Sequence, residues 1–194
     1  MKNDKNIFTP LGASNHSKGV REEHDFYATS PLAIHKLLDH ESFSNAIWEP
    51  ACGLGHLSEV LKLRGYNVYS SDLFYRGYSN QNSICDFLKQ NYSLIADCDI
   101  ITNPPYKNVT EFILKALDLV TTGHKVAMFL KLLTLEGQKR YEQIFSKQPP
   151  KTIYVFIKRV LCGKNGNFEG QSAICYAWFV WEKGFKGDPI IKWI

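Results

Sequence analysis

Residues 99–106 read Asp-Ile-Ile-Thr-Asn-Pro-Pro-Tyr, an apolar run that ends abruptly at two prolines. Proline has no backbone N–H, so Pro104 and Pro105 cannot continue a strand ladder, and they hold the residue before them extended. We therefore expect a buried strand that ends at a stiff turn displaying Asn103 and Tyr106. An amide and a phenol ring on such a turn suit the binding of a flat ligand that carries an amine. A plain strand-ending turn is the alternative reading of the same residues.

The chain has 194 residues, of which 44% are hydrophobic and 22% are charged, so we expect one soluble globular domain. Residues 1–24 are polar and are expected to form a flexible arm, with the domain over residues 25–194. No apolar run of about 18 residues predicts a membrane helix, and no apolar signal segment is seen. The net charge of +4 is compatible with nucleic acid binding without demonstrating it. Five cysteines without a C-x-x-C pair indicate neither a zinc site nor a disulfide framework, and they favour reduced thiols in a cytoplasmic protein.

Strand and helix patterns alternate along the chain up to residue 145, and two strand patterns then follow each other directly. Strands are predicted at 46–49, 66–71, 84–85, 99–102, 125–133, 152–160 and 173–181. Helical spacing of apolar residues predicts helices at 31–38, 57–63, 110–120 and 136–145. The alternation predicts an α/β fold with a mostly parallel seven-stranded sheet covered on both faces, and the last two strands predict a C-terminal antiparallel hairpin.

A glycine-containing loop, Glu49-Pro50-Ala51-Cys52-Gly53-Leu54-Gly55, follows the first of these strands. The loop lacks the third glycine of a dinucleotide motif and the G-K-[ST] of a phosphate-binding loop. Glu49 would repel a phosphate, but it could meet the ammonium group of an amino-acid-like ligand. Asp72 stands 17 residues beyond Gly55, at the end of the second strand, where a carboxylate can accept both hydroxyls of a ribose. Together these residues indicate S-adenosylmethionine, whereas singly they also fit a tight turn and a solvated turn residue.

These stretches resemble the motifs of DNA adenine-N6 methyltransferases. The loop from Glu49 to Gly55 is similar to the cofactor motif of that family, and Asn103-Pro104-Pro105-Tyr106 is similar to its catalytic motif. Asp25-Phe26-Tyr27-Ala28-Thr29-Ser30-Pro31 resembles the N-terminal cofactor motif, with Ser30 as an extra residue. The order of the motifs resembles the arrangement in which target recognition follows catalysis, and especially small phage- or prophage-encoded members without a large recognition domain.

The resemblance implies a Rossmann-like class I methyltransferase fold with S-adenosylmethionine as cofactor. It implies that Asn103, Pro104, Pro105 and Tyr106 form the catalytic motif for methyl transfer to the N6 amine of a flipped adenine in DNA. The residues implied to hold the cofactor are Tyr27, Thr29, Glu49, Pro50, Ala51, Cys52, Gly53, Gly55, Asp72, Leu73, Asp86, Phe87 and Asn103.

The chemistry of the catalytic motif follows from its acceptors. The Asn103 side chain and the Pro104 backbone each offer a carbonyl oxygen, and together they could accept both N–H groups of an exocyclic amine. That geometry localises the nitrogen lone pair and aims it at the cofactor methyl, which is catalysis by positioning and preorganised dipoles. Tyr106 would stack on the extruded base. No metal is required.

The polar loop over residues 162–170 supplies the remaining substrate candidates. Phe168 is expected to stack on the second face of the base while Asn165 or Asn167 reads base edges, although the segment also fits a hairpin tip with an accidental aromatic. The candidates for phosphate contact are Lys107, Lys158, Arg159 and Lys164, each of which singly also fits a solvated surface. We expect a short or relaxed recognition site. An RNA adenine or a protein glutamine as substrate, a non-catalytic cofactor-dependent binding module, and a monomer or a homodimer all stay open.

Overall fold

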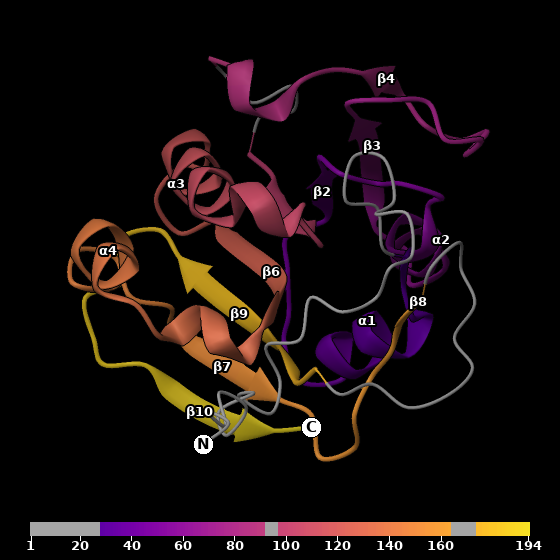
Figure 1. The fold of residues 1–194 in the computed structure, drawn as a ribbon. Helices are drawn as coiled ribbons and strands as arrows, with labels where there is room; N and C mark the ends of the chain where they lie inside the picture. Colours follow the sequence, from indigo (N-terminus) through magenta and orange to yellow (C-terminus); the bar gives the residue numbers. More distant parts are fainter. Residues whose placement is uncertain (1–27, 92–96, 164–173) are drawn as a thin grey trace, which may run out of the picture.

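A computed structural model describes residues 28–91, 97–163 and 174–194, so the expected arm at 1–24 lies outside the described residues. The main sheet has eight strands in the order β10-β7-β9-β6-β5-β2-β3-β4 (Figure 1). Every strand of this sheet is parallel to the others except β9, which is antiparallel to β6 and β7. The strands are β2 (Ala46–Glu49), β3 (Asn67–Asp72), β4 (Ser83–Ile84), β5 (Asp99–Thr102), β6 (Lys125–Lys131), β7 (Thr152–Val155), β9 (Tyr176–Glu182) and β10 (Ile190–Trp193).

The α/β class and the C-terminal antiparallel hairpin predicted from the sequence are confirmed, since β7 and β9 pair antiparallel with Thr152 opposite Val180. The sheet has one strand more than the seven predicted, because β10 joins β7 as a parallel edge strand. All four residues of β10 are exposed, so this strand lacks the alternation that marks a half-buried strand. A second, two-stranded sheet pairs β1 (Ala28–Thr29) with β8 (Cys162–Gly163) in antiparallel register.

Helices cover both faces of the main sheet. The helices α1 (Pro31–Leu38) and α2 (His56–Leu63) lie on one face, and α3 (Val109–Leu119) lies on the other (Figure 1). Alternate residues of the central strands point into the two cores, so Ile101 packs with α1 and α2 while Ile100 packs with α3. The first helix begins as its sequence predicts, because the Ser30 side chain accepts a hydrogen bond from the Leu32 N–H and Pro31 occupies the first turn.

The helix predicted at 136–145 forms over residues 138–145 as two consecutive pieces, and the end of the strand predicted at 125–133 forms a 3₁₀ turn instead. A 3₁₀ turn, η4 (Leu132–Leu135), follows β6 directly, and α4 (Gln138–Arg140) leads into the π-helical turn η5 (Tyr141–Phe145). The Arg140 guanidinium donates to the carbonyls of Leu133, Thr134 and Glu136, which holds the chain in this irregular path. Two further 3₁₀ turns are η2 (Phe87–Lys89) and η3 (Tyr106–Asn108). Among the described residues, no helix has the length and hydrophobicity of a membrane-spanning segment.

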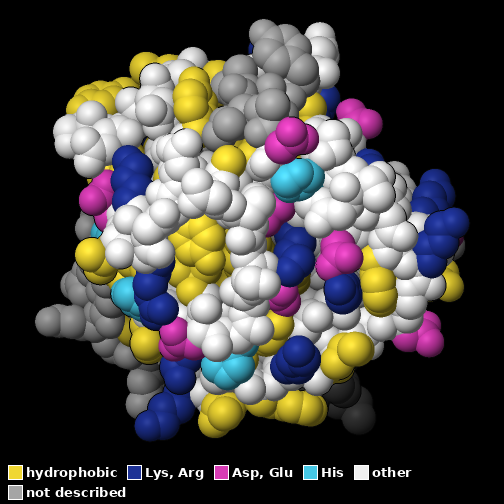
Figure 2. Space-filling view, turned by 180° about the vertical axis from the view of Figure 1, so that it is seen from behind, with side chains coloured by type: hydrophobic (Ala, Val, Ile, Leu, Met, Phe, Trp, Pro, Cys, Tyr) yellow, Lys and Arg dark blue, Asp and Glu magenta, His cyan; other side chains and the backbone are white. Residues whose placement is uncertain are grey.

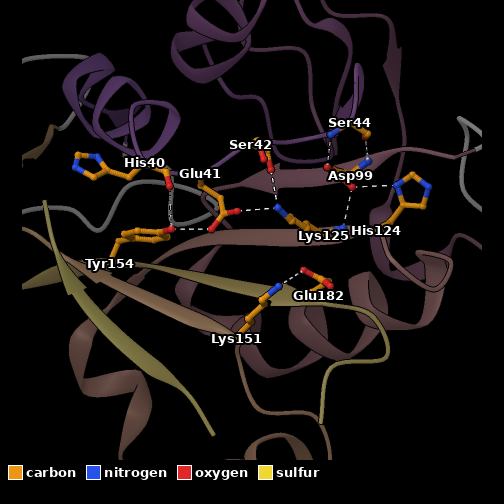
Figure 3. Close-up of polar contacts among 10 residues, drawn as sticks. All are labelled: His40, Glu41, Ser42, Ser44, Asp99, His124, Lys125, Lys151, Tyr154 and Glu182. Atoms are coloured by element: carbon orange, nitrogen blue, oxygen red, sulfur yellow. Dashed lines mark hydrogen bonds and ion pairs between the residues drawn. The ribbon is translucent and has the colours of Figure 1, made fainter. Parts of the chain in front are cut away.

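The amino-terminal edge of the sheet is tied together by a buried carboxylate (Figure 3). Asp99 at the start of β5 accepts hydrogen bonds from the Ser44 N–H at 2.6 Å, the Lys125 N–H at 2.8 Å and the His124 ring at 3.0 Å. The Lys125 ammonium in turn forms an ion pair with Glu41 at 2.7 Å. These contacts satisfy backbone donors that precede β2 and begin β6, so they fix the starts of the central strands relative to one another.

Candidate active site

A pocket opens at the carboxyl ends of β2, β3 and β5, where the strand order reverses between β2 and β5. This reversal is the place where open α/β sheets bind ligands. The pocket is lined by Ala28, Thr29, Glu49, Pro50, Ala51, Cys52, Leu54, His56, Leu57, Asp72, Leu73, Phe74, Arg76, Cys85, Asp86, Phe87, Leu88, Asn103, Pro104, Pro105, Tyr106, Asn108 and Phe112.

The predicted cofactor and catalytic residues converge on this pocket. All four members of the catalytic motif line it, and so do most of the described residues expected to hold the cofactor. Those lining residues are Thr29, Glu49, Pro50, Ala51, Cys52, Asp72, Leu73, Asp86, Phe87 and Asn103. Gly53 and Gly55 shape the loop without lining the pocket, and Tyr27 lies outside the described residues.

Asp72 joins the end of β3 to the glycine loop. Its Oδ2 accepts a hydrogen bond from the Gly53 N–H at 2.9 Å, and its Oδ1 accepts one from the Phe74 N–H at 3.1 Å. The Arg76 guanidinium lies 3.6 Å from Oδ1, and Asp72 is buried, with 6% of the residue exposed. Asp72 therefore fixes the loop and is also one of the residues that line the pocket.

Gly55 makes the turn from the loop into α2 possible. Its φ of +82° is in the left-handed region, and a Cβ added there would lie 2.4 Å from the ring of Tyr78. Tyr78 is buried, donates to Glu59 at 2.5 Å and accepts from Lys62 at 3.0 Å. The segment after β3 is thus fastened onto α2 through a tyrosine that the sequence analysis did not single out.

Glu49 ends β2 in a buried polar network. Its side chain accepts a hydrogen bond from the Ser58 hydroxyl, and Ser58 Oγ lies 2.5 Å from Ser70 Oγ. Glu49 is 1% exposed, and this burial, with the nearby Asp72 carboxylate adding to it, raises the pKa of Glu49 to about 8. The side chain is therefore mostly protonated at pH 7, and a cation placed against it would favour the ionised form.

Asn103 is held by a hydrogen bond to β1, near the beginning of the described chain. The motif begins where β5 ends, and the Asn103 Nδ2 donates a hydrogen bond to Thr29 Oγ1 at 2.8 Å. Pro104 is buried, and Pro105 precedes η3, whose Asn108 N–H donates to the Pro105 carbonyl at 3.0 Å. The two prolines therefore form the stiff turn that the sequence predicts, with Asn103 on the pocket side of it.

Tyr106 belongs to a column of stacked aromatic rings. Its ring stacks on Tyr176 at 6.1 Å between centroids, and Tyr176 stacks on Phe129 at 4.9 Å. The Lys131 ammonium lies 4.6 Å from the Tyr106 ring centroid, and the Tyr106 hydroxyl lies 3.5 Å from Cys162 Sγ. Burial raises the pKa of Tyr106 well above its ordinary value, so the phenol is neutral at neutral pH.

The structure leaves the predicted phosphate-binding cations outside the pocket. Lys107, Lys158 and Arg159 are exposed, and none of the three lines it. On the face seen in Figure 2, Lys and Arg side chains are interspersed with Asp and Glu and form no single basic patch. The other predicted substrate residues, Lys164, Asn165, Asn167 and Phe168, lie outside the described residues.

Some pocket residues were not predicted from the sequence. His56 is the first residue of α2, directly after Gly55, and burial lowers its pKa. Arg76 follows Asp72 by four residues, and Phe112 reaches the pocket from α3. His56 could have been predicted because it directly follows the glycine loop, and Arg76 because it lies four residues after Asp72. Within the described ranges, no group of three or more His, Cys, Asp or Glu side chains could hold a metal ion.

No protein-family model matches this sequence, and comparison with curated proteins finds no match. The fold of this chain is similar to those of several solved structures. A protein of Listeria monocytogenes described as a class I S-adenosylmethionine-dependent methyltransferase superposes with a TM-score of 0.63 at 14% identity, over 91% of this chain and 68% of that one. A protein of Pyrococcus horikoshii described as an RNA methyltransferase gives a TM-score of 0.59 at 16% identity, over 86% of this chain and 91% of that one.

A third similar structure comes from Vibrio vulnificus. It is the modification subunit described for a type I restriction enzyme of Vibrio vulnificus, with a TM-score of 0.57 at 14% identity. The match covers 89% of this chain, which spans 48% of that subunit. At these identities the likeness concerns the fold alone. This chain has the Rossmann-like fold of class I methyltransferases.

Proposed function

We propose that this protein transfers the methyl group of S-adenosylmethionine to the exocyclic N6 amine of a flipped adenine in DNA. One observation carries the proposal. The Asn103-Pro104-Pro105-Tyr106 turn ends β5 in the same pocket as the glycine loop of β2 and the Asp72 carboxylate of β3. The pocket thus combines acceptors for an amine with residues suited to an amino acid joined to a nucleoside.

The lining of the pocket fits the cofactor. Asp72 would accept the ribose hydroxyls, and the half-exposed, apolar Leu73 beside it would pack on the cofactor's adenine. Asp86 would accept from the adenine amine, although its Oδ1 already accepts from the Leu88 N–H at 3.1 Å. Glu49 ends β2 beside the glycine loop, and its buried carboxyl would meet the ammonium group of the cofactor. When bound, the cofactor supplies an electrophilic methyl group.

The chain's own contribution to the reaction is positioning. Asn103 Oδ1 and the Pro104 carbonyl would each accept one N–H of the target amine, which localises the nitrogen lone pair toward the methyl group. Tyr106, supported by Tyr176 beneath it, would stack on the base and hold it outside the helix. After transfer, the extra proton on nitrogen leaves to water, since Tyr106 is a neutral phenol at the reaction pH.

A transfer assay tests the proposal. Purified protein with methyl-labelled S-adenosylmethionine is given DNA, RNA or unmodified protein, and label is expected in DNA. Asn103→Ala is expected to lose the transfer while it keeps measurable cofactor binding in calorimetry. Asn45→Ala, an exposed asparagine at the opposite edge of the sheet, is the matched control and is expected to behave as the unaltered protein.

The outcomes of the assay separate the rival substrates. Label in RNA or on protein glutamine, with none in DNA, would overturn the DNA assignment. Cofactor binding without transfer to any of the three pools would indicate a binding module and overturn the enzymatic proposal. Transfer that persists in Asn103→Ala would show that this amide is not the acceptor of the target amine.

A further inference from the structure

The two-stranded sheet of β1 and β8 contacts both ends of the catalytic motif. Thr29 in β1 and Cys162 in β8 are direct cross-strand partners. Thr29 Oγ1 accepts the hydrogen bond from Asn103 Nδ2 at 2.8 Å, and Cys162 Sγ lies 3.5 Å from the Tyr106 hydroxyl. One residue pair of the small sheet therefore touches the two side chains that the reaction needs.

The position of Thr29 is fixed by backbone on both sides. Ala28 pairs with Gly163, and the Ser30 N–H donates to the Leu161 carbonyl at 3.2 Å. Ser30 is also the N-cap of α1, which packs in the core. Thr29 itself is 4% exposed, so its hydroxyl is held in place and removed from competing water.

The orientation of the Asn103 amide matters for the reaction. An amide has an acceptor and a donor end of nearly the same shape, so rotation by 180° exchanges them. With Nδ2 directed at Thr29, the oxygen is the end turned away from Thr29, in a side chain that lines the pocket. The reversed amide would present N–H groups to an amine whose own N–H groups need acceptors.

We propose that Thr29 is a positioning residue for methyl transfer, whose hydroxyl holds the Asn103 amide with its oxygen toward the target amine. The inference rests on the proposed function, because it requires a reaction in which Asn103 accepts from the substrate. It differs from the role that the sequence resemblance implies for Thr29, which is direct contact with the cofactor. The two roles predict different kinetic effects.

Two substitutions separate the hydroxyl of Thr29 from its methyl group. Thr29→Val keeps the shape and the β-branch but removes the hydroxyl, whereas Thr29→Ser keeps the hydroxyl and removes the methyl. We expect Thr29→Val to lower kcat about 10-fold, as loss of one buried hydrogen bond predicts, with the cofactor Kd changed less than about 2-fold. Thr29→Ser is expected to recover most of the turnover.

Three kinetic results would overturn the proposal. Full kcat in Thr29→Val would show that the hydroxyl is dispensable. Equal losses in Thr29→Val and Thr29→Ser would indicate a packing role. A weakened cofactor Kd with unchanged kcat in Thr29→Val would make Thr29 a cofactor ligand instead.

A measurement on the unaltered protein keeps the inference separate from the proposed function. The side-chain NH₂ resonances of Asn103, identified by their absence in Asn103→Ser, should include one proton protected from exchange with water. Fast exchange of both protons would overturn the contact with Thr29 even if DNA is methylated. A protected proton in a protein that methylates no polymer would instead count against the proposed function alone.

Discussion

Replacement of Glu49 by glutamine removes one titratable proton from the buried polar network behind the glycine loop. Glutamine has nearly the shape of the protonated carboxyl, and its amide oxygen can still accept the hydrogen bond from Ser58. The folded protein raises the pKa of Glu49 from 4.5 to about 8, because the side chain is buried. The folded state thus holds this proton more tightly than the unfolded chain does.

The sign and size of the effect follow from this pKa. A carboxyl that is more basic in the folded state contributes stability that is fully present below pH 4.5 and is lost as the pH rises through 8. Between pH 5 and pH 8 the free energy of unfolding is therefore expected to fall by roughly 3–4 kcal/mol, at 1.36 kcal/mol for each pH unit. Glu49→Gln removes this contribution to the pH dependence.

Urea unfolding between pH 5 and pH 8.5 measures the effect. The unaltered protein and Glu49→Gln should be about equally stable at pH 5, and the variant should be more stable at pH 8. Glu136→Gln, which changes an exposed glutamate, is the control and should follow the unaltered protein. Parallel pH profiles for the unaltered protein and Glu49→Gln would refute the reasoning, because they would show that Glu49 is ionised in the folded state throughout this range.

Three further substitutions test other parts of the site and the fold. Asp72→Ala should weaken cofactor affinity about 10-fold or more through loss of acceptors, and unchanged affinity in calorimetry would mean that the ribose binds elsewhere. Gly55→Ala should lower the melting temperature and the cofactor affinity, because the new Cβ meets Tyr78 at 2.4 Å; an unchanged melting curve would contradict this. Asp99→Asn should lower the free energy of unfolding in urea by about 1–3 kcal/mol, because it turns one acceptor oxygen into a donor at the far edge of the sheet. Cofactor affinity should not change, and a loss of affinity would indicate coupling across the sheet.

Local signals were sufficient for the parts of the fold and site that the sequence predicted. The apolar run before Pro104 and Pro105 encodes both a buried strand and its end, and the glycine loop with Asp72 encodes two neighbouring strand ends. Parallel strands bring their carboxyl ends to one edge, so these stretches meet in one pocket without any further information.

Contacts between distant segments could not be predicted in the same way. Thr29 and Asn103 are 74 residues apart, and Tyr106 and Cys162 are 56 apart, so their pairing depends on where β1 and β8 lie in the folded chain. Packing of Tyr78 against Gly55 depends likewise on the path of the segment after β3. The edge strand β10 was not predicted, because its sequence, Ile-Ile-Lys-Trp, does not alternate between apolar and polar residues.

The identity of the methylated product tests the central claim most directly. DNA treated with the protein and methyl-labelled S-adenosylmethionine is digested to nucleosides, which are separated by chromatography and identified by mass spectrometry. The account predicts labelled N6-methyl-2′-deoxyadenosine from the unaltered protein and none from Asn103→Ala. Label on cytosine would contradict the account. So would the absence of any labelled nucleoside when the protein is shown to bind both the DNA and the cofactor.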